Sequence, residues 1–457
     1  MPRVHFVGIG GTGISALALL LLERGWEVSG TDMHASPYFN KVTQSGARTL
    51  VGHHPEIAEK AEFVVRSSAV KESDPEVVAA KNAGVPVMRR IDFLPMLTEG
   101  YTTLAVAGSH GKTTTTAMLV TLMQALDEDV TYILGAEIKA LGANAHHGLS
   151  EYLVIEADEY DFMFLGLDPK VSLITNIEHD HPDCFPTERD YLNAFSSFVD
   201  RTVPRGVCIA CGDNTGVQSL QSMRKSTSPM IKTFGFSAVN EYLIQQLSWQ
   251  NACFTFTLTY HGEPLGSFKL GLPGKHNVLN AAGALAVLNE CGFDLSKLST
   301  ALRVFSGTER RFDIVYDREG VVILNDYGHH PTQINAVLSA ARDLYPEKTL
   351  WAVWEPHTYS RTLAMQDEFI HAFSLADKVR IARIYAAREE DTGITPAPIA
   401  AALPDASYFF EYEDLAENIS QNLRGDDLVV VLSAGKGPMI SHMVMEKIAQ
   451  KTSKGSE

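Results

Sequence analysis

The sequence predicts an α/β protein of three domains, built on parallel sheets with crossover helices. Short apolar, β-branched runs alternate with longer helical patterns along the whole chain, which is typical of parallel strands joined by helices. The length of 457 residues corresponds to three domains at about 150 residues each. From shifts in composition we place these domains at residues 1–98, 99–306 and 307–457.

Composition and charge exclude several classes of protein. Apolar residues make up 45% of the chain and charged residues 20%, as in globular rather than disordered or fibrous proteins. The net charge of −17 argues against a general nucleic-acid surface, although a small anion can still bind in a local basic pocket. The longest mostly apolar run, residues 14–22, is far shorter than the roughly 20 residues of a membrane span. With five cysteines and no signal-peptide pattern, we expect a cytoplasmic protein without membrane insertion or a nucleic-acid partner.

A glycine loop follows the first predicted strand, at residues 4–7, and precedes a helix at residues 15–24. It has the pattern Gly8-x-Gly10-x-x-Gly13, and a second strand leads to Asp32. Glycines allow a tight turn in which backbone N–H groups approach an anion at a helix N-terminus. Asp32 stands where an acidic group usually binds a ribose hydroxyl. The pattern predicts a Rossmann-like domain, and NAD, FAD and a nucleotide sugar all suit the loop.

A second loop, with the sequence GSHGKT from Gly108 to Thr113, joins a strand at residues 102–107 to a helix at residues 114–126. Lys112 would neutralise the charge of the β- and γ-phosphates, and Thr113 would offer its hydroxyl to Mg²⁺. Val106 stands where the motif G-x-x-x-x-G-K-T has its first glycine, so the loop is a variant. We expect a central P-loop ATPase domain.

Two later strands of the central segment end in acidic residues. A strand at residues 152–155 continues into EADEYD, and one at residues 171–175 continues into NIEHDH. Ligands gather beyond the carboxyl ends of parallel strands, so these side chains are candidate Mg²⁺ ligands or general bases. A crowded carboxylate-phosphate site would also suit two metal ions. A solvated surface position is an equal alternative for any one of four acids: Asp158, Glu159, Asp161 and Glu178.

Further polar motifs lie downstream. The sequence PGKHNVLNAA from Pro273 opens a helix, and residue type alone favours helix capping over contacts with a purine edge. The third segment has strands at residues 321–324, 350–354, 379–384 and 428–432. NDYGHHPT follows the first of these strands and EPHTYSRT the second. There Arg361 would bind a carboxylate as a fork, and His330 or His357 would orient a phosphate or an amine, although each histidine is equally well explained as structural.

Two segments are expected to have no functional role. The CxxC sequence from Cys208 to Cys211 lies in an apolar, strand-like run and has no second pair of ligands, so we expect it in the core. The tail from residue 452 to the end is expected to be unstructured.

Taken together, the motifs resemble those of the Mur ligases of peptidoglycan synthesis. The resemblance covers nearly the whole chain in the family's order: HFVGIGGTGISALA, SSAVKESDPEVVAA, VAGSHGKTTTTAM, EADEYD, TNIEHDHPD, GKHNVLNAAGA, GTERRF, NDYGHHPT and PHTYSRT. The resemblance is strongest for the alanine-adding branch of the family. Several other Mur ligases use a carbamylated lysine, and no lysine stands between Lys170 and Lys225 here, which fits that branch.

The resemblance implies a reaction and its partners. ATP would phosphorylate the carboxylate of UDP-N-acetylmuramate, and the amine of L-alanine would attack the acyl phosphate to give an amide, ADP and phosphate. The enzyme would contribute positioning and charge neutralisation. The implied metal is Mg²⁺, with Mn²⁺ as a substitute, and the expected assembly is a monomer or homodimer.

It also implies site residues. ATP would be held by Gly108, Ser109, His110, Gly111, Lys112, Thr113 and Thr114, and its adenine by His276, Asn277 and Asn280. The adenine role replaces the helix-capping interpretation of the motif that contains these last three residues. Asp326 would be a further nucleotide contact. The metal residues would be Thr113, Glu156 and His181, and the catalytic ones Lys112, His110, His181 and Arg361. The UDP part would be held by Gly8, Gly10, Gly11, Gly13, Asp32, Ser67 and Ser68, and the amino acid by Tyr327, His357 and Arg361.

The chain departs from the family pattern at two positions. Many relatives have Asp-Asp-Tyr where Asn325-Asp326-Tyr327 stands, and an arginine where Thr358 stands. Without that arginine, Arg361 is the main carboxylate fork, so the departure bears on amino-acid affinity and specificity.

Three other functions compete with this one. A recycling ligase that joins UDP-N-acetylmuramate to an intact tripeptide would suit EADEYD, but PHTYSRT fits the alanine-adding enzymes better. A nicotinamide oxidoreductase would use the first glycine loop and leave the second unexplained. A nucleotide-sugar sensor without turnover would not need Lys112, Glu156 and His181 together.

Overall fold

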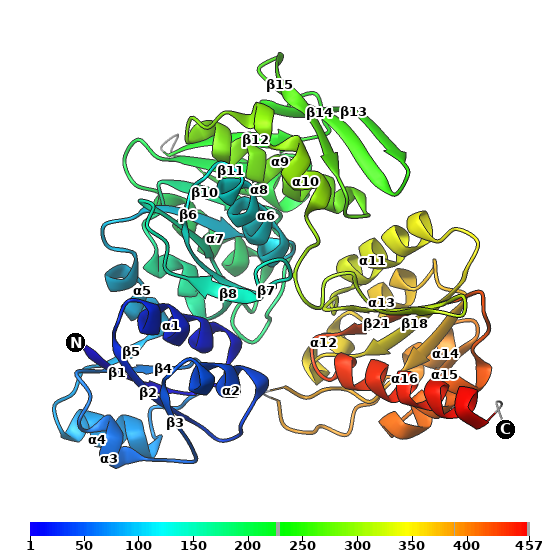
Figure 1. Ribbon diagram of the computed structural model, residues 1–457, viewed down its shortest axis with the longest axis horizontal. Coiled ribbons are helices and arrows are strands. Elements are labelled where there is room, and N and C mark those ends of the chain that lie inside the picture. Colours follow the sequence, from blue (N-terminus) through cyan, green and yellow to red (C-terminus); the bar gives the residue numbers. More distant parts are fainter. Residues whose placement is uncertain (225–228, 388, 455–457) are drawn as a thin grey trace. The chain divides into compact units, whose positions relative to one another are not determined.

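The computed structural model (Figure 1) describes residues 1–224, 229–387 and 389–454. The chain forms three α/β domains, each built around its own sheet, as the sequence predicted. They fall into two compact units. The first unit is Met1–Gly271 with Val278–Ser306 and holds the N-terminal and central domains; the second is Leu272–Asn277 with Gly307–Glu457.

The N-terminal domain is a parallel five-stranded sheet in the order β3-β2-β1-β4-β5. Two of its helices start where a capping side chain precedes a proline: Ser36 accepts from the Phe39 N–H before α2, and Asp74 accepts from the Glu76 N–H before α4. Proline fits the first helical turn, where no N–H partner is needed. The elements are β1 (Arg3–Val7), α1 (Thr12–Glu23), β2 (Glu27–Asp32), α2 (Pro37–Gln44), β3 (Arg48–Val51), α3 (Pro55–Ala58), β4 (Phe63–Arg66), α4 (Pro75–Asn82), β5 (Val87–Arg89) and α5 (Arg90–Thr98).

The central domain is built on a ten-stranded sheet in the order β15-β14-β13-β12-β11-β10-β6-β9-β7-β8. Its strands are β6 (Thr102–Ala107), β7 (Thr131–Ile138), β8 (Ala143–His146), β9 (Tyr152–Glu156), β10 (Val171–Ile174), β11 (Val207–Cys211), β12 (Met230–Gly235), β13 (Tyr242–Gln250), β14 (Cys253–Tyr260) and β15 (Glu263–Leu270). Its helices are α6 (Lys112–Gln124), η1 (Tyr160–Gly166), α7 (Glu188–Asp200), α8 (Thr215–Met223), α9 (Lys275–Glu290), η2 (Leu295–Lys297) and α10 (Ser299–Val304).

This sheet is mixed: it contains the predicted parallel strands with crossover helices and also antiparallel strands, which the sequence analysis did not predict. β13, β14 and β15 pair antiparallel, as do β7 and β8. Two-residue turns join the first three strands, and Asn251, Ala252, His261 and Gly262 in these turns have left-handed backbones. Parallel neighbours need a crossover of a dozen or more residues, so such short connections require antiparallel hairpins.

Within the first unit, the N-terminal domain packs on the central one through α1. That helix lies against β7 and β8, and its apolar residues share a core with the central domain. Polar contacts surround the junction: Lys41 Nζ donates to Glu137 Oε1 at 2.5 Å, and Glu23 accepts from the His147 N–H at 2.6 Å. The helix that follows the first glycine loop is therefore anchored to the domain that carries the second loop.

The C-terminal domain has a six-stranded sheet in the order β16-β17-β21-β18-β19-β20, in which only the edge strand β16 runs antiparallel to its neighbour. The strands are β16 (Asp313–Arg318), β17 (Val321–Asp326), β18 (Thr349–Glu355), β19 (Lys378–Ile381), β20 (Ala406–Tyr408) and β21 (Asp427–Ser433). The helices are α11 (Pro331–Leu344), α12 (Tyr359–Ala364), α13 (Gln366–Ala372), α14 (Ala397–Ala402), α15 (Tyr412–Asn422) and α16 (Gly437–Lys454).

The two segments without an expected function have different outcomes. Cys208 and Cys211 are buried in β11, as predicted, and burial raises the pKa of both thiols to about 11. The tail prediction was wrong for its first part, because α16 continues to Lys454; residues 455–457 lie outside the described residues, as does Lys225. Among the residues that the structure describes, no helix combines the length and apolar character needed to cross a bilayer.

Phe164 gives a test of the first unit's core. Its ring is fully buried and stacks on Phe198 with centroids 4.8 Å apart. We expect Phe164→Ala to lower the free energy of unfolding by about 3–5 kcal/mol, measured by urea denaturation. Val239→Ala, at a side chain that is 83% exposed, is the control and should change it by less than about 0.5 kcal/mol. Equal effects of the two substitutions would contradict this packing.

Candidate active site

The second glycine loop turns sharply after β6. Gly108 has φ +135°, and a Cβ there would lie 2.0 Å from Thr175 Oγ1. Gly111 has φ +80° and precedes α6, which begins at Lys112, with Thr113 and Thr114 in its first turn. Val106, where the usual motif has its first glycine, is buried inside β6. Gly108 is thus the first glycine of the turn.

Asn176, which follows β10, holds the loop in this shape. Its carbonyl accepts from the Ser109 N–H at 3.1 Å, and its side-chain oxygen accepts from the His110 N–H at 2.9 Å. Its side-chain N–H donates back to the His110 carbonyl at 2.9 Å. An asparagine at the end of the neighbouring strand thus supplies partners for three backbone groups of the loop. Asn176 was not a predicted site residue.

The ammonium group of Lys112 is held by hydrogen bonds within the central domain. Its Nζ donates to the Gly108 carbonyl at 2.6 Å and to Glu159 Oε2 at 2.7 Å. Burial alone would lower the pKa of Lys112, but the carboxylates of Glu159 and Asp158 outweigh it and raise that pKa. The lysine therefore carries a positive charge at neutral pH, next to the backbone turn.

Glu159 is itself fully buried and is oriented by Tyr191 of α7. The Tyr191 hydroxyl donates to Glu159 Oε1 at 3.2 Å and lies 2.9 Å from Ser109 Oγ. Burial, with the nearby Glu159 charge, raises the pKa of Tyr191 well above its ordinary value, so the hydroxyl keeps its proton. Tyr191 was also missed from the sequence.

The expected metal residues fall into two groups. Thr113 Oγ1 donates to Glu156 Oε1 at 2.8 Å, while Glu156 Oε2 accepts from the Gly135 N–H at 2.7 Å. His181 has Nε2 3.6 Å from Glu159 Oε1 and 3.9 Å from Asp180 Oδ2. The hydroxyl and carboxylate oxygens of the first group are hard ligands that suit Mg²⁺.

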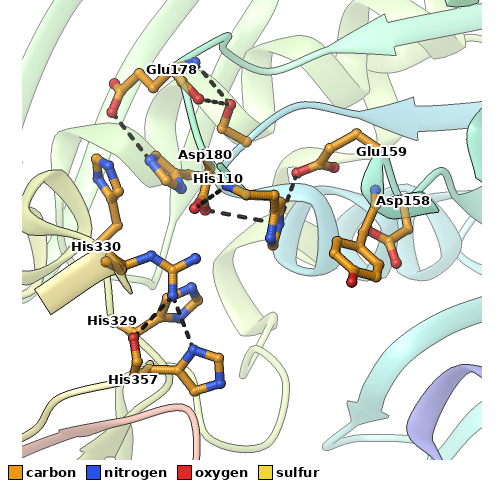
Figure 2. A network of polar contacts seen from close by, with 12 residues as sticks. His110, Asp158, Glu159, Glu178, Asp180, His329, His330 and His357 are labelled. Atoms are coloured by element: carbon orange, nitrogen blue, oxygen red, sulfur yellow. Dashed lines mark hydrogen bonds and ion pairs between the residues drawn. The ribbon is translucent and has the colours of Figure 1, made fainter. Parts of the chain in front are cut away.

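His110 is paired with Glu178, as the dashed line between them in Figure 2 shows. The distance from His110 Nε2 to Glu178 Oε2 is 3.1 Å. Ser109 Oγ both donates to the Glu178 carbonyl and accepts from the Glu178 N–H, each at 2.8 Å. An imidazole-carboxylate pair beside the lysine loop can accept or pass on a proton.

The first glycine loop rests on the end of β2. The N–H groups of Gly8 and Ile9 donate to the Thr31 carbonyl at 2.8 and 2.9 Å. Asp32 Oδ2 accepts from the Gly10 N–H at 2.9 Å. Gly8 has φ +86°, and Gly11 is the N-cap of α1. The predicted strand-loop-helix-strand unit is confirmed, and Asp32 supports the loop's own backbone.

Two serines and an arginine lie beside this loop. A Cβ on Gly8 would lie 2.9 Å from Ser67 Cβ, and Ser68 Oγ donates to Asp161 Oδ2 at 2.8 Å. The Arg90 guanidinium lies where a Gly13 side chain would be, 2.7 Å from the Cβ position. A cation at the positive end of a helix needs a counter-charge, and the Asp158 carboxylate, with Oδ2 4.0 Å from Arg90 Nη1, supplies one. Arg90, the first residue of α5, was not a predicted site residue.

The residues expected to contact adenine are divided between the two units. Asn280, on α9 in the first unit, has Oδ1 2.7 Å from the Cβ position of Gly111. His276 and Asn277 belong to the second unit, where Asn277 Nδ2 donates to the Pro273 carbonyl at 2.7 Å. Burial, with the nearby Arg311 charge, lowers the pKa of His276 to about 4, so its ring is neutral near pH 7.

In the second unit, Asp326 and Tyr327 end β17. Asp326 accepts from the Gly328 N–H at 2.7 Å and the Phe312 N–H at 2.8 Å. Its burial raises the pKa of the carboxyl, against an opposing effect of Arg311. The guanidinium groups of Arg310 and Arg311 lie 5.0 and 4.9 Å from the centre of the Tyr327 ring.

His357 and Arg361 lie together after β18. Arg361 Nη1 is 3.0 Å from His357 Nδ1, and the rings of His357 and His329, both labelled in Figure 2, have centroids 5.3 Å apart. Thr358 has φ +68° and accepts from the Arg361 N–H as the N-cap of α12. His330 accepts from the Thr332 N–H as the N-cap of α11, which supports a structural role for that histidine.

Three family models match successive parts of the chain. They are "Mur ligase family, catalytic domain" over residues 3–102, "Mur ligase middle domain" over residues 106–288 and "Mur ligase, glutamate ligase domain" over residues 310–435. The chain belongs to the Mur ligase family. The resemblance inferred from the sequence motifs is thus confirmed.

This Mur ligase has relatives of full length. A UDP-N-acetylmuramate--L-alanine ligase of Caldanaerobacter subterraneus subsp. tengcongensis is 36% identical over 95% of this chain and 95% of its own. One of Frankia casuarinae is 38% identical over 92% of this chain and 91% of its own. The crystal structure of a UDP-N-acetylmuramate-alanine ligase from Thermotoga maritima matches 99% of this chain and 100% of its own, with a TM-score of 0.83 and 25% identity. A murein peptide ligase from Psychrobacter arcticus, with a TM-score of 0.72 and 21% identity over 98% of this chain and 99% of its own, shares the fold.

Gly108 of this Mur ligase gives a test of the loop geometry. Gly84 also has a left-handed backbone, φ +76°, but open space around its Cβ position. We expect Gly84→Ala to cost about 1–2 kcal/mol of stability from the backbone alone. Gly108→Ala should cost more, because the new methyl group meets Thr175. Thermal denaturation of both variants checks this, and a loss at Gly108 no greater than at Gly84 would speak against the close approach.

Proposed function

We propose that this Mur ligase forms the amide bond between L-alanine and the carboxylate of UDP-N-acetylmuramate, with conversion of ATP to ADP and phosphate. The observation that carries the proposal is the full-length similarity to ligases of that description, at 36% identity in one case. It is supported by two glycine loops of the phosphate-binding type, one in the N-terminal domain and one in the central domain, within one compact unit.

The chemistry explains why ATP is needed. A carboxylate is a poor electrophile, so one of its oxygens first attacks the γ-phosphorus of ATP, the bond to ADP breaks, and an acyl phosphate forms. The amine of L-alanine then attacks the carbonyl carbon and loses a proton, and the tetrahedral intermediate expels phosphate. The protein contributes alignment and neutralisation of the phosphoryl charge.

We assign the first step to the loop after β6. Lys112 exchanges its contact with Glu159 for the γ-phosphate, and the phosphates would lie at the N-terminal end of α6, which follows the loop. Thr113, Glu156 and His181 are the proposed metal residues, and bound Mg²⁺, or Mn²⁺ in its place, would neutralise phosphate charge. His110, paired with Glu178, is placed in the catalytic group as a proton acceptor or phosphate contact.

The UDP part is assigned to the first glycine loop. Gly8, Gly10, Gly11 and Gly13 are the proposed loop residues: the loop leads into α1, and the positive N-terminal end of that helix would favour the diphosphate, with the Arg90 guanidinium beside it. Asp32, Ser67 and Ser68 complete the proposed set.

Assignments in the remaining segments follow the family motifs. His276, Asn277 and Asn280 are the proposed adenine contacts and Asp326 a further nucleotide contact. Tyr327, His357 and Arg361 are the proposed amino-acid residues, and the structure gives Thr358 a capping role rather than the charge that an arginine would bring. We propose that residues 1–98, 99–306 and 307–457 serve UDP-substrate, ATP and amino-acid binding respectively, in a cytoplasmic monomer or homodimer.

The experiment that tests this function is phosphate release from Mg-ATP with UDP-N-acetylmuramate as acceptor. We expect release with L-alanine, and little with the L-Ala-γ-D-Glu-diaminopimelate tripeptide. Release only with the tripeptide would assign the enzyme to recycling and remove our amino-acid assignments. Release with neither would refute both ligase activities.

The role of Lys112 is tested by Lys112→Ala. Loss of the ammonium group of the loop should lower phosphate release roughly 100-fold or more, while UDP-N-acetylmuramate binding, measured by calorimetry, stays nearly intact. Lys60→Ala, at an exposed lysine, is the control. Equal loss of both properties in the Lys112 variant would show that the two loops are wrongly assigned.

A further inference from the structure

A fully buried carboxylate in the N-terminal domain has no part in the proposed mechanism. Glu76, on α4, is 0% exposed. Its Oε2 accepts from Thr31 Oγ1 at 2.6 Å and lies 3.1 Å from His5 Nε2, while its Oε1 accepts from the His54 N–H at 2.5 Å. An isolated charge is costly to bury, and here both oxygens have donors.

The surroundings keep this carboxyl ionised. Burial alone would raise the pKa of Glu76, but the hydrogen bonds from His5, Thr31 and the His54 backbone outweigh burial and lower the pKa. His5 Nδ1 in turn lies 2.9 Å from Ser29 Oγ on β2. Glu76 therefore ties α4 to two central strands and to the segment after β3.

The two strands that Glu76 holds are those that carry the first glycine loop. His5 lies on β1, which leads into Gly8. Thr31 lies near the end of β2, and its carbonyl accepts from both the Gly8 and Ile9 N–H groups. The next residue, Asp32, accepts from the Gly10 N–H. Three successive N–H groups of the loop thus depend on where the Thr31–Asp32 backbone lies.

We propose that Glu76 is a positioning residue of the UDP-substrate site, acting through Thr31 on the shape of the glycine loop. The inference rests on the proposed function for the identity of the ligand. Glu76 contacts Thr31 rather than the loop itself. Because Thr31 sets the shape of the loop, we expect Glu76 to affect the affinity for the UDP-substrate. The ATP loop has its own supports, at Asn176 and Thr175, and is not expected to respond.

A conservative replacement separates geometry from charge. In Glu76→Gln the amide oxygen can accept from the His54 N–H, while the amide N–H donates to the Thr31 hydroxyl and to His5 Nε2, because the imidazole can take its other tautomer. Glutamine therefore preserves the positions of the partners. Glu76→Ala removes all three contacts, and Thr31→Val removes only the hydroxyl while keeping the shape of the side chain.

The test compares these variants in the full chain. Calorimetry with UDP-N-acetylmuramate and steady-state kinetics should show a rise of about 10-fold or more in Kd and KM for Glu76→Ala, and of about 3-fold or more for Thr31→Val. Glu76→Gln should stay within about 3-fold of wild type, and KM for ATP and kcat within about 2-fold in all variants. Thr202→Val is the matched control: this threonine is also buried, and its hydroxyl lies 2.9 Å from Ser172 Oγ, outside both loops.

A purely structural role predicts another pattern. Melting temperatures would then fall in Glu76→Ala and Thr31→Val while Kd and KM for UDP-N-acetylmuramate stay at the wild-type value, and that result would overturn the proposal. If Glu76→Ala does not fold, Thr31→Val against Thr202→Val decides. A wild type that binds UDP-N-acetylmuramate but releases no phosphate refutes the ligase proposal and leaves the Glu76 comparison valid, whereas a wild type that does not bind it refutes both.

Discussion

The positive charge of Lys112 has to be accommodated where water has little access, since only 13% of the side chain is exposed. A buried ammonium needs a counter-charge and hydrogen-bond acceptors, and these come from separate parts of the central domain. The counter-charge is Glu159, which follows β9 and accepts from Lys112 Nζ. Tyr191 of α7 donates to Glu159 and also contacts Ser109. The neutralisation of one lysine therefore links the end of β6, the end of β9 and α7.

Both glycine loops follow the same physical solution. A loop of glycines has little conformational preference of its own, so its shape is set by acceptors on a neighbouring strand. Thr31 and Asp32 do this for the first loop, and Asn176 for the second. The support of the first loop is itself fixed, because Glu76 accepts from the Thr31 hydroxyl. In the second loop, Ser109 Oγ adds a further bond by accepting from the Glu178 N–H.

The motifs were predictable from the sequence because their signals are local. Gly108 to Thr113 and Gly8 to Asp32 are continuous patterns between a strand and a helix, and the structure has them in that context. Asn176, Tyr191 and Arg90 were not found, because their importance comes from partners 66, 82 and 77 positions away rather than from neighbours in the chain, as with the contacts His110–Asn176 and Ser109–Tyr191. The hairpins of β13 to β15 were missed for a different reason: Asn251-Ala252 and His261-Gly262 are weaker turn signals than Asn-Gly.

The third glycine of the first loop is required for a different structural reason from the other two. Gly13 lies within α1 with an ordinary helical backbone, so no turn requires a glycine there. Instead, the Arg90 guanidinium occupies the space that a side chain at residue 13 would need. A methyl group at residue 13 would displace that cation from the start of the helix. In a map of mutational tolerance, this position would therefore follow the side chain at residue 90, and alanine would be accepted wherever that side chain does not extend over the start of the helix.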